Sequence, residues 1–76
     1  MTNINVSQCR AARAVLRMKL RELSERAGVG STTITVWESG RSNPTPETLD
    51  RIRKVFEAEG IVFLNDGDMP GLRFKR

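Results

Sequence analysis

The segment from Leu20 to Arg41 constrains the fold of this 76-residue chain more than any other part of it. It reads LRELSERAGVGSTTITVWESGR, in which two short helical patterns flank a turn that contains glycine. The first pattern predicts a helix over residues 20–27, because apolar residues recur there at helical spacing. Its core-facing residues are expected to be Leu20, Leu23 and Ala27. Gly28 follows, and a glycine in the left-handed conformation commonly ends a helix.

The second helix of this segment is predicted over residues 31–39, with Gly30 or Ser31 as its cap. Val29 should enter the core from the turn, and Ile34 and Trp37, three residues apart, should face inward. The residues that then face outward are Ser31, Thr32, Thr35 and Val36. Two short helices joined in this way are the layout of a DNA-binding helix-turn-helix, whose second helix enters the major groove.

Further helices are predicted on both sides of this segment. The first should run over residues 7–17 with Ser7 as its cap. A fourth helix should begin after Thr45, which caps it, with Pro46 at its first position, and should end at Gly60. The apolar stripe of this fourth helix consists of Leu49, Ile52, Val55 and Phe56.

After Gly60 the hydrophobic period changes, and residues 61–76 predict either a β-hairpin with a long loop or a single strand with a loose tail. An isolated hairpin is marginally stable in water and needs a partner surface. One solution is pairing with the same strand of a second subunit, and the other is packing on the chain's own helices. The residues expected to mediate dimerisation are Ile61, Val62, Phe63, Leu64, Leu72 and Phe74.

Composition excludes several classes of site. Cys9 is the single cysteine and there is no histidine, so we expect no disulfide, metal site, cofactor or enzyme activity, and Cys9 should be buried. No apolar run approaches the roughly 18 residues of a membrane span and no signal peptide is recognised, which favours a cytoplasmic protein. The net charge of +4 and the pI near 10.2 suit a polyanionic partner, or serve solubility alone.

Residues 9–60 resemble the Cro/phage-repressor-like (XRE-type) helix-turn-helix family of bacterial and phage transcription regulators. The matching elements are CRAAR at 9–13, ELSERAGV at 22–29, STTITVWESGR at 31–41 and NPTPETL at 43–49. The final stretch, FEAEGIVFLNDGDMPGLRFKR, resembles the ending of a compact subset with a strand after the helical domain. The resemblance implies a mainly α, four-helix-bundle-like, lambda-repressor-like single domain over 1–76, with a helix-turn-helix core over 7–60 and a dimerisation element over 61–76.

The resemblance also implies residue roles. The helix over 31–39 becomes the recognition helix, with base contacts from Ser31, Thr32, Thr35 and Val36. Contacts to the DNA backbone are implied for Lys19, Leu20, Ser39, Arg41, Asn43 and Thr45. The family usually has a Ser or Thr cap and then a glutamine where this chain has Lys19 and Leu20, so backbone N–H groups would bind the phosphate there. Arg13 and Glu38 match positions that commonly form a partly buried ion pair.

Other basic residues have competing interpretations. Arg10 and Arg17 are expected to face solvent or phosphate, whereas Arg51, Arg53 and Lys54 should form an ordinary solvated helix face. A basic tail of Arg73, Lys75 and Arg76 could touch DNA or simply protect a strand edge.

These observations lead to the expectation of a sequence-specific regulator of double-stranded DNA. It is expected to be a repressor that binds an inverted-repeat operator as a homodimer. Its expected location is the cytoplasm, in association with the nucleoid, in a bacterial or phage setting. The alternative is a protein-interaction module, or an antitoxin-like partner of a regulatory protein, that uses the C-terminal strand.

Overall fold

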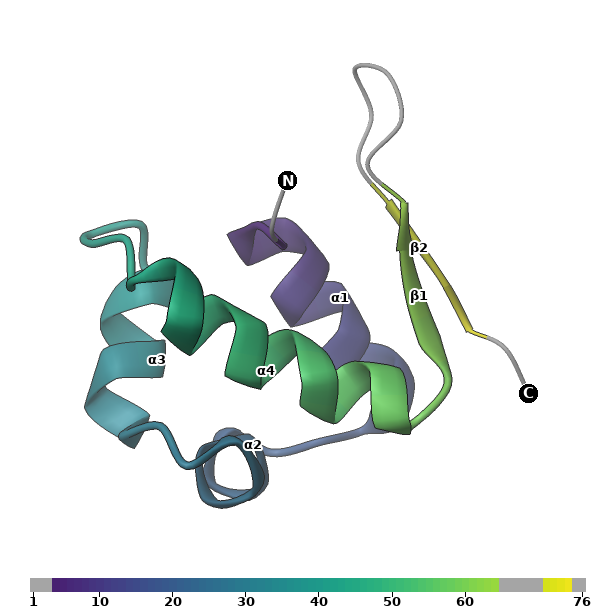
Figure 1. The fold of residues 1–76 in the computed structure, drawn as a ribbon, viewed down its shortest axis with the longest axis horizontal. Coiled ribbons are helices and arrows are strands. Elements are labelled where there is room, and N and C mark those ends of the chain that lie inside the picture. The colour runs from purple at the N-terminus through teal and green to yellow at the C-terminus, as the bar shows by residue number, and fades with distance from the viewer. Residues whose placement is uncertain (1–3, 65–70, 75–76) are drawn as a thin grey trace.

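The computed structural model describes residues 4–64 and 71–74. Within these residues the chain forms four helices and then two strands. They are α1 (Val6–Leu16), α2 (Leu20–Ala27), α3 (Ser31–Glu38), α4 (Pro46–Ala58), β1 (Ile61–Leu64) and β2 (Gly71–Phe74). The helices enclose a common core and the strands form a hairpin beside them (Figure 1). The expected fold class, mainly helical with a short C-terminal β element, is confirmed.

The start of α1 differs from the prediction. Asn5 caps the helix, and Ser7 is an exposed residue of its first turn. The Asn5 side chain accepts a hydrogen bond from the backbone N–H of Gln8 at 2.8 Å, and the Gln8 side chain accepts one from the Asn5 N–H at 2.9 Å. This reciprocal capping box satisfies two N–H groups that the helix leaves unpaired, so it outcompetes a cap at Ser7. The helix ends at Leu16, followed by Arg17 in the left-handed conformation.

The other helix ends follow the predicted signals. Gly28 stands at the end of α2 with φ 68°, a conformation that costs glycine little. Thr45 caps α4 by accepting a hydrogen bond from the Thr48 N–H at 3.3 Å, and Pro46 occupies the first turn. The last residue of α3 is Glu38, one before the predicted Ser39.

The core consists of apolar residues from every helix and from β1. Leu23, Ile34, Ile52, Phe56 and Ile61 are fully buried, and Val29 and Trp37 lie with them. Each such side chain contributes roughly 1.5–3 kcal/mol by leaving water. Leu20 was expected to be buried in this core; at the first position of α2 it is half-buried and packs against the edge of the core.

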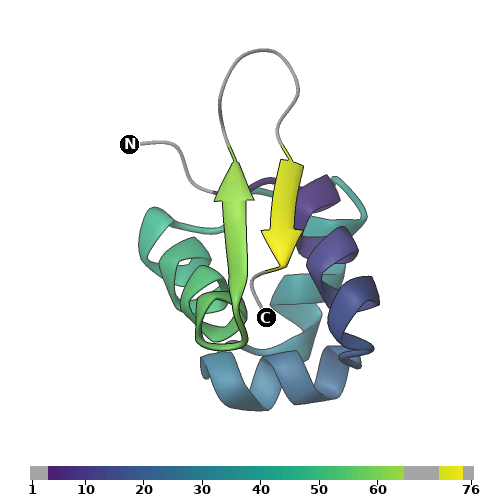
Figure 2. The same cartoon turned by 90° about the vertical axis from the view of Figure 1, so that its right-hand side faces the viewer.

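The two strands form an antiparallel hairpin in the register from Ile61 opposite Phe74 to Leu64 opposite Gly71. In Figure 2 they lie across the helices, with β1 on the side of α4 and β2 on the side of α1. Since directly opposite residues share a face, one face carries Ile61, Phe63, Leu72 and Phe74, which pack against the core. The other face carries Val62, Leu64, Gly71 and Arg73.

The buried side chain of Gln8 fastens this hairpin to α1. Its Nε2 donates to the backbone oxygens of Leu64 at 3.3 Å and Gly71 at 2.9 Å. The hairpin therefore packs on the chain's own helices, one of the two solutions that the sequence left open. It occupies the opposite end of the molecule's longest dimension, 29 Å, from α3 (Figure 1).

Candidate nucleic-acid interface

The turn between α2 and α3 fixes where α3 begins. The N–H groups of Gly28 and Val29 both donate to the Ser24 carbonyl, at 3.0 and 3.2 Å. The Ser24 hydroxyl donates to the Val29 carbonyl at 2.6 Å, while the Val29 side chain is buried. These contacts hold the turn to α2 and to the core, so the first residues of α3 are presented in a fixed position.

The surface of α3 is polar and rich in hydroxyl groups. Ser31, Thr32 and Thr35 are exposed as predicted, and Val36 is half-buried. Thr33 is exposed as well. Thr33 was not among the predicted contacts, although its place between outward-facing Thr32 and buried Ile34 could have indicated its exposure. The outer face of α3 thus offers neutral hydrogen-bonding groups and methyl groups, and no charge.

An ion pair holds α3 against α1. Arg13 Nη1 lies 2.7 Å from Glu38 Oε1, and Arg13 Nε donates to the Met18 carbonyl at 3.2 Å. The second oxygen of Glu38 accepts a hydrogen bond from Cys9 Sγ at 3.3 Å. Burial raises the pKa of the Cys9 thiol, and the nearby charge of Glu38 raises it further. Cys9 is therefore a neutral hydrogen-bond donor inside the protein, in agreement with its expected burial.

The start of α2 carries no side-chain cap. The first N–H groups of α2, like those of any helix, lack an intrahelical partner. Lys19 precedes the helix in an extended conformation and makes no side-chain capping hydrogen bond, so its side chain does not satisfy them. Lys19 and Ser31 line one surface hollow, which brings the starts of α2 and α3 together. Arg21, which the sequence analysis did not select, lines it too; its exposed place in the first turn was a usable signal. The hollow is completed by Leu20, Ser24 and Glu25.

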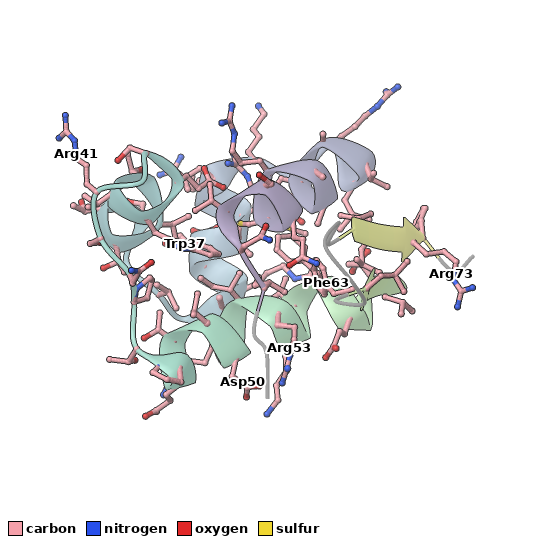
Figure 3. The ribbon with its side chains drawn as sticks, turned by 90° about the horizontal axis from the view of Figure 1, so that it is seen from above. Trp37, Arg41, Asp50, Arg53, Phe63 and Arg73 are labelled. Atoms are coloured by element: carbon pink, nitrogen blue, oxygen red, sulfur yellow. The ribbon has the colours of Figure 1, made fainter. Side chains whose placement is uncertain are left out.

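The connection from α3 to α4 contains the remaining predicted contacts. Arg41 and Asn43 are exposed, and Arg41 projects from one end of the molecule (Figure 3). Arg41 makes no ion pair with any residue in 4–64 or 71–74. The Ser39 hydroxyl donates to the Val36 carbonyl at 2.7 Å, and Thr45 serves as the cap of α4. Two of the four predicted contact residues in this stretch, Ser39 and Thr45, therefore already have partners within the chain.

Basic residues of α4 are paired with acidic residues of the same helix. Arg51 lies 3.4 Å from Glu47 and Lys54 lies 3.0 Å from Asp50. The hydrogen bond from Lys54 lowers the pKa of Asp50, with further contributions from the charge of Lys54 and from Arg53. Arg53 differs from the solvated face that was expected, because its guanidinium is half-buried between Asp50 and Glu57. Figure 3 shows Asp50 and Arg53 on the side of the molecule away from α1.

The hairpin residues assigned to dimerisation are divided between its two faces. Ile61 is buried, and Phe63 packs edge-to-face on Phe56 with ring centroids 6.0 Å apart. Leu64, by contrast, is 40% exposed on the outer face, beside half-buried Val62. Arg73 lies at the other end of the molecule from Arg41 (Figure 3). Lys75 and Arg76 lie outside the described residues, as does the segment 65–70.

A family model described as helix-turn-helix matches residues 10–60, which include most of α1 and all of α2, α3 and α4. A comparison with curated proteins finds no match. Among the residues that the structure describes, no helix is both long and apolar enough to span a bilayer.

Proposed function

Because the chain belongs to the XRE-type helix-turn-helix family of DNA-binding transcription regulators, we propose that it is a repressor that reads an inverted-repeat operator as a homodimer. In this proposal α3 is the recognition helix and lies in the major groove. The observation that carries it is the exposed hydroxyl face of α3, held in place by the Arg13–Glu38 ion pair and by buried Ile34 and Trp37. The residues proposed to meet base edges are Ser31, Thr32, Thr35 and Val36.

The chemistry of this face sets the kind of readout. Serine and threonine hydroxyls can donate or accept, and the methyl groups of Thr32 and Val36 can pack on a thymine methyl. None of these side chains makes the bidentate base contacts of arginine, asparagine or glutamine. We therefore expect sequence-dependent DNA shape to supply a large share of the specificity.

Backbone contacts in this proposal flank the recognition helix. Lys19 and the free N–H groups beginning at Leu20 face one phosphate, helped by the positive end of α2. Arg41, Asn43 and the Thr45 hydroxyl reach phosphates on the other side. Ser39 can donate to a phosphate only by giving up its hydrogen bond to the Val36 carbonyl.

Dimerisation is assigned to the hairpin. It lies at the end of the molecule away from α3, so a second copy can bind there without covering the recognition helix (Figure 1). For binding to an inverted repeat, the two-fold axis has to place the two recognition helices in successive major grooves, about 34 Å apart. A dimer bound across a promoter, which could be the promoter of its own gene, would repress transcription by blocking polymerase.

The test begins by selecting bound duplexes from a random pool and measuring their affinity by fluorescence anisotropy. We expect an inverted repeat to be selected. Thr32→Ala should weaken binding to the selected duplex about 2- to 10-fold and relax preference at one base pair in each half-site. Arg41→Ala should weaken binding to selected and random duplexes alike and reduce the salt slope by about 1. The control is Lys54→Gln, which removes the charge paired with Asp50 on the side of the molecule away from α1. Unchanged affinity in both Thr32→Ala and Arg41→Ala would refute the site assignment.

A second candidate is a protein-interaction module that uses the hairpin. It is favoured by the exposed apolar side chain of Leu64 on the outer face and by the missing side-chain cap at Lys19. A strand edge can add to the sheet of a partner. This alternative predicts that Val62→Pro abolishes function while Thr32→Ala and Arg41→Ala leave it intact, the reverse of the result expected for a repressor.

A further inference from the structure

A second surface hollow lies at the C-terminal end of α1 and is lined by cations without any carboxylate. Its lining residues are Arg10, Arg13, Ala14, Arg17, Met18 and Lys19. Among the described residues, Arg13 is neutralised by Glu38, but Arg10, Arg17 and Lys19 form no ion pair. All three are exposed. A shallow hollow with three exposed cations, none within ion-pair distance of a described carboxylate, favours an anionic ligand.

The backbone at Arg17 is unusual. Arg17 has φ 53° and ψ 39°, and among the described residues it is the only one other than glycine with a positive φ. The N–H of Arg17 donates to the Ala14 carbonyl at 3.2 Å, and the N–H of Met18 donates to the Arg13 carbonyl at 2.8 Å. These two bonds close the helix with a turn in which glycine is the favoured residue. An arginine there tolerates a strained conformation, and such residues cluster at binding sites.

This hollow adjoins the one at the starts of α2 and α3, because both are lined by Lys19. Lys19 lines both hollows: the one with Arg10 and Arg17, and the one with Arg21 and Ser31. Arg10 and Arg13 lie three residues apart on one face of α1, and Arg17, just past the end of the helix, lines the same hollow. The central member, Arg13, contacts Glu38 of α3, which turns this face toward α3. A DNA backbone that follows the start of α3 past Lys19 therefore reaches the α1 hollow.

We propose that Arg10, Arg17 and Lys19 form a phosphate-binding site for the DNA backbone, outside the bases that α3 reads. This inference rests on the proposed function. Guanidinium and ammonium groups form short charge-assisted hydrogen bonds with phosphate oxygens, and each neutralised phosphate releases counterions. Arg10 and Arg17 thereby extend the phosphate contact that the proposed function assigns to Lys19 and to the backbone N–H groups at the start of α2.

The test measures the salt dependence of binding for Arg10→Gln and Arg17→Gln. The probes are a labelled duplex of random sequence and the selected operator, titrated at several NaCl concentrations. Each substitution should flatten the plot of log affinity against log salt by about 0.9 for each phosphate that the variant no longer neutralises. Affinity should fall by a similar factor on both duplexes, because a backbone contact carries no sequence information.

Three further variants separate the role of the side chain from folding and from net charge. Arg17→Lys keeps the charge and should retain the wild-type slope. Arg17→Gly suits the left-handed backbone conformation and should fold. It should nevertheless flatten the plot of log affinity against log salt by as much as Arg17→Gln does. Lys54→Gln removes one charge on the side of Asp50 and should leave the slope unchanged.

Two outcomes distinguish failure of this phosphate site from failure of the proposed function. If the wild-type chain binds neither duplex, both the proposed function and this site are wrong. If the wild type binds with a steep salt dependence, and Arg10→Gln and Arg17→Gly keep its slope, the α1 site is refuted and the proposed function stands.

Discussion

At the scale of single residues, Glu38 makes the contacts that position α3, the proposed recognition helix. Its carboxylate accepts hydrogen bonds from Arg13 Nη1 at 2.7 Å and from Cys9 Sγ at 3.3 Å, and its side chain is only 14% exposed. We expect Arg13→Met to lower the free energy of unfolding by about 1–3 kcal/mol, because it leaves this charge without a partner. The loss should be smaller than for a fully buried pair, since solvent reaches both side chains. Urea denaturation measures it.

The double variant Arg13→Met/Glu38→Leu is the control for this prediction. Removing both charges leaves no unpaired carboxylate, so the double variant should be less destabilised than the sum of the two single variants. A stability of Arg13→Met within about 0.5 kcal/mol of wild type would mean that the pair contributes no more than an ordinary surface contact.

Cys9 makes the free energy of unfolding depend on pH in the alkaline range. Its ordinary pKa is 9.0 and burial raises it in the folded chain, so above pH 9 the unfolded chain loses a proton that the folded chain keeps. The contribution is fully present below pH 9 and falls by about 1.4 kcal/mol per pH unit above it, until the thiol ionises in the folded chain too. Denaturation at several pH values should show this slope in wild type but not in Cys9→Ala. Parallel curves for the two proteins would contradict it.

At the scale of secondary-structure elements, Gln8 joins the helical part to the hairpin. Its side chain accepts from the Asn5 N–H and donates to the carbonyls of Leu64 and Gly71. Gln8→Ala should therefore cost about 1–2 kcal/mol more than Asn5→Ala, which removes only the other half of the cap. It should also speed amide hydrogen exchange in β1. Equal stabilities and equal exchange rates would show that Gln8 acts only as a capping residue.

The elements could largely be predicted from the sequence because their signals are local. Gly28 ends α2, Thr45 and Pro46 begin α4, and Ile34 and Trp37 face the core, each from spacing or from residue type. The predicted cap of α1, Ser7, is wrong, although Asn5 with Gln8 three residues later is an equally local signal. The error arises because a glutamine such as Gln8 is common anywhere in a helix, so it indicates a capping box only when it is taken together with Asn5.

The remaining features depend on contacts between distant residues. No pattern in the sequence joins Gln8 to Leu64 or Gly71, so whether the hairpin packs on its own helices could not be decided in advance. The pairing of Arg13 with Glu38 was implied only by the family resemblance. The half-burial of Arg53 likewise arises from packing. The sequence did not indicate it, because the periodicity of α4 places Arg53 beside solvated neighbours.

At the scale of the whole molecule, α3, the proposed recognition helix, and the hairpin lie at opposite ends (Figure 1). We expect Leu64→Glu to keep the fold but to sediment as a monomer, because the substitution places a charge on the exposed apolar side of the hairpin. Val15→Glu alters the other large exposed apolar residue of the described chain, on α1, and is the matched control. Dissociation by Val15→Glu but not by Leu64→Glu would place the dimer contact on α1.

The most direct test of the central claim, sequence-specific recognition of DNA, compares two duplexes by fluorescence anisotropy. One is the DNA upstream of the chain's own gene and the other has random sequence, each titrated at two salt concentrations. We predict a preference of about 10³-fold for the upstream duplex, the order expected of specific regulators, and a lower affinity for both at higher salt. Absence of binding to both duplexes at moderate salt would contradict the account and leave the protein-interaction module as the better description.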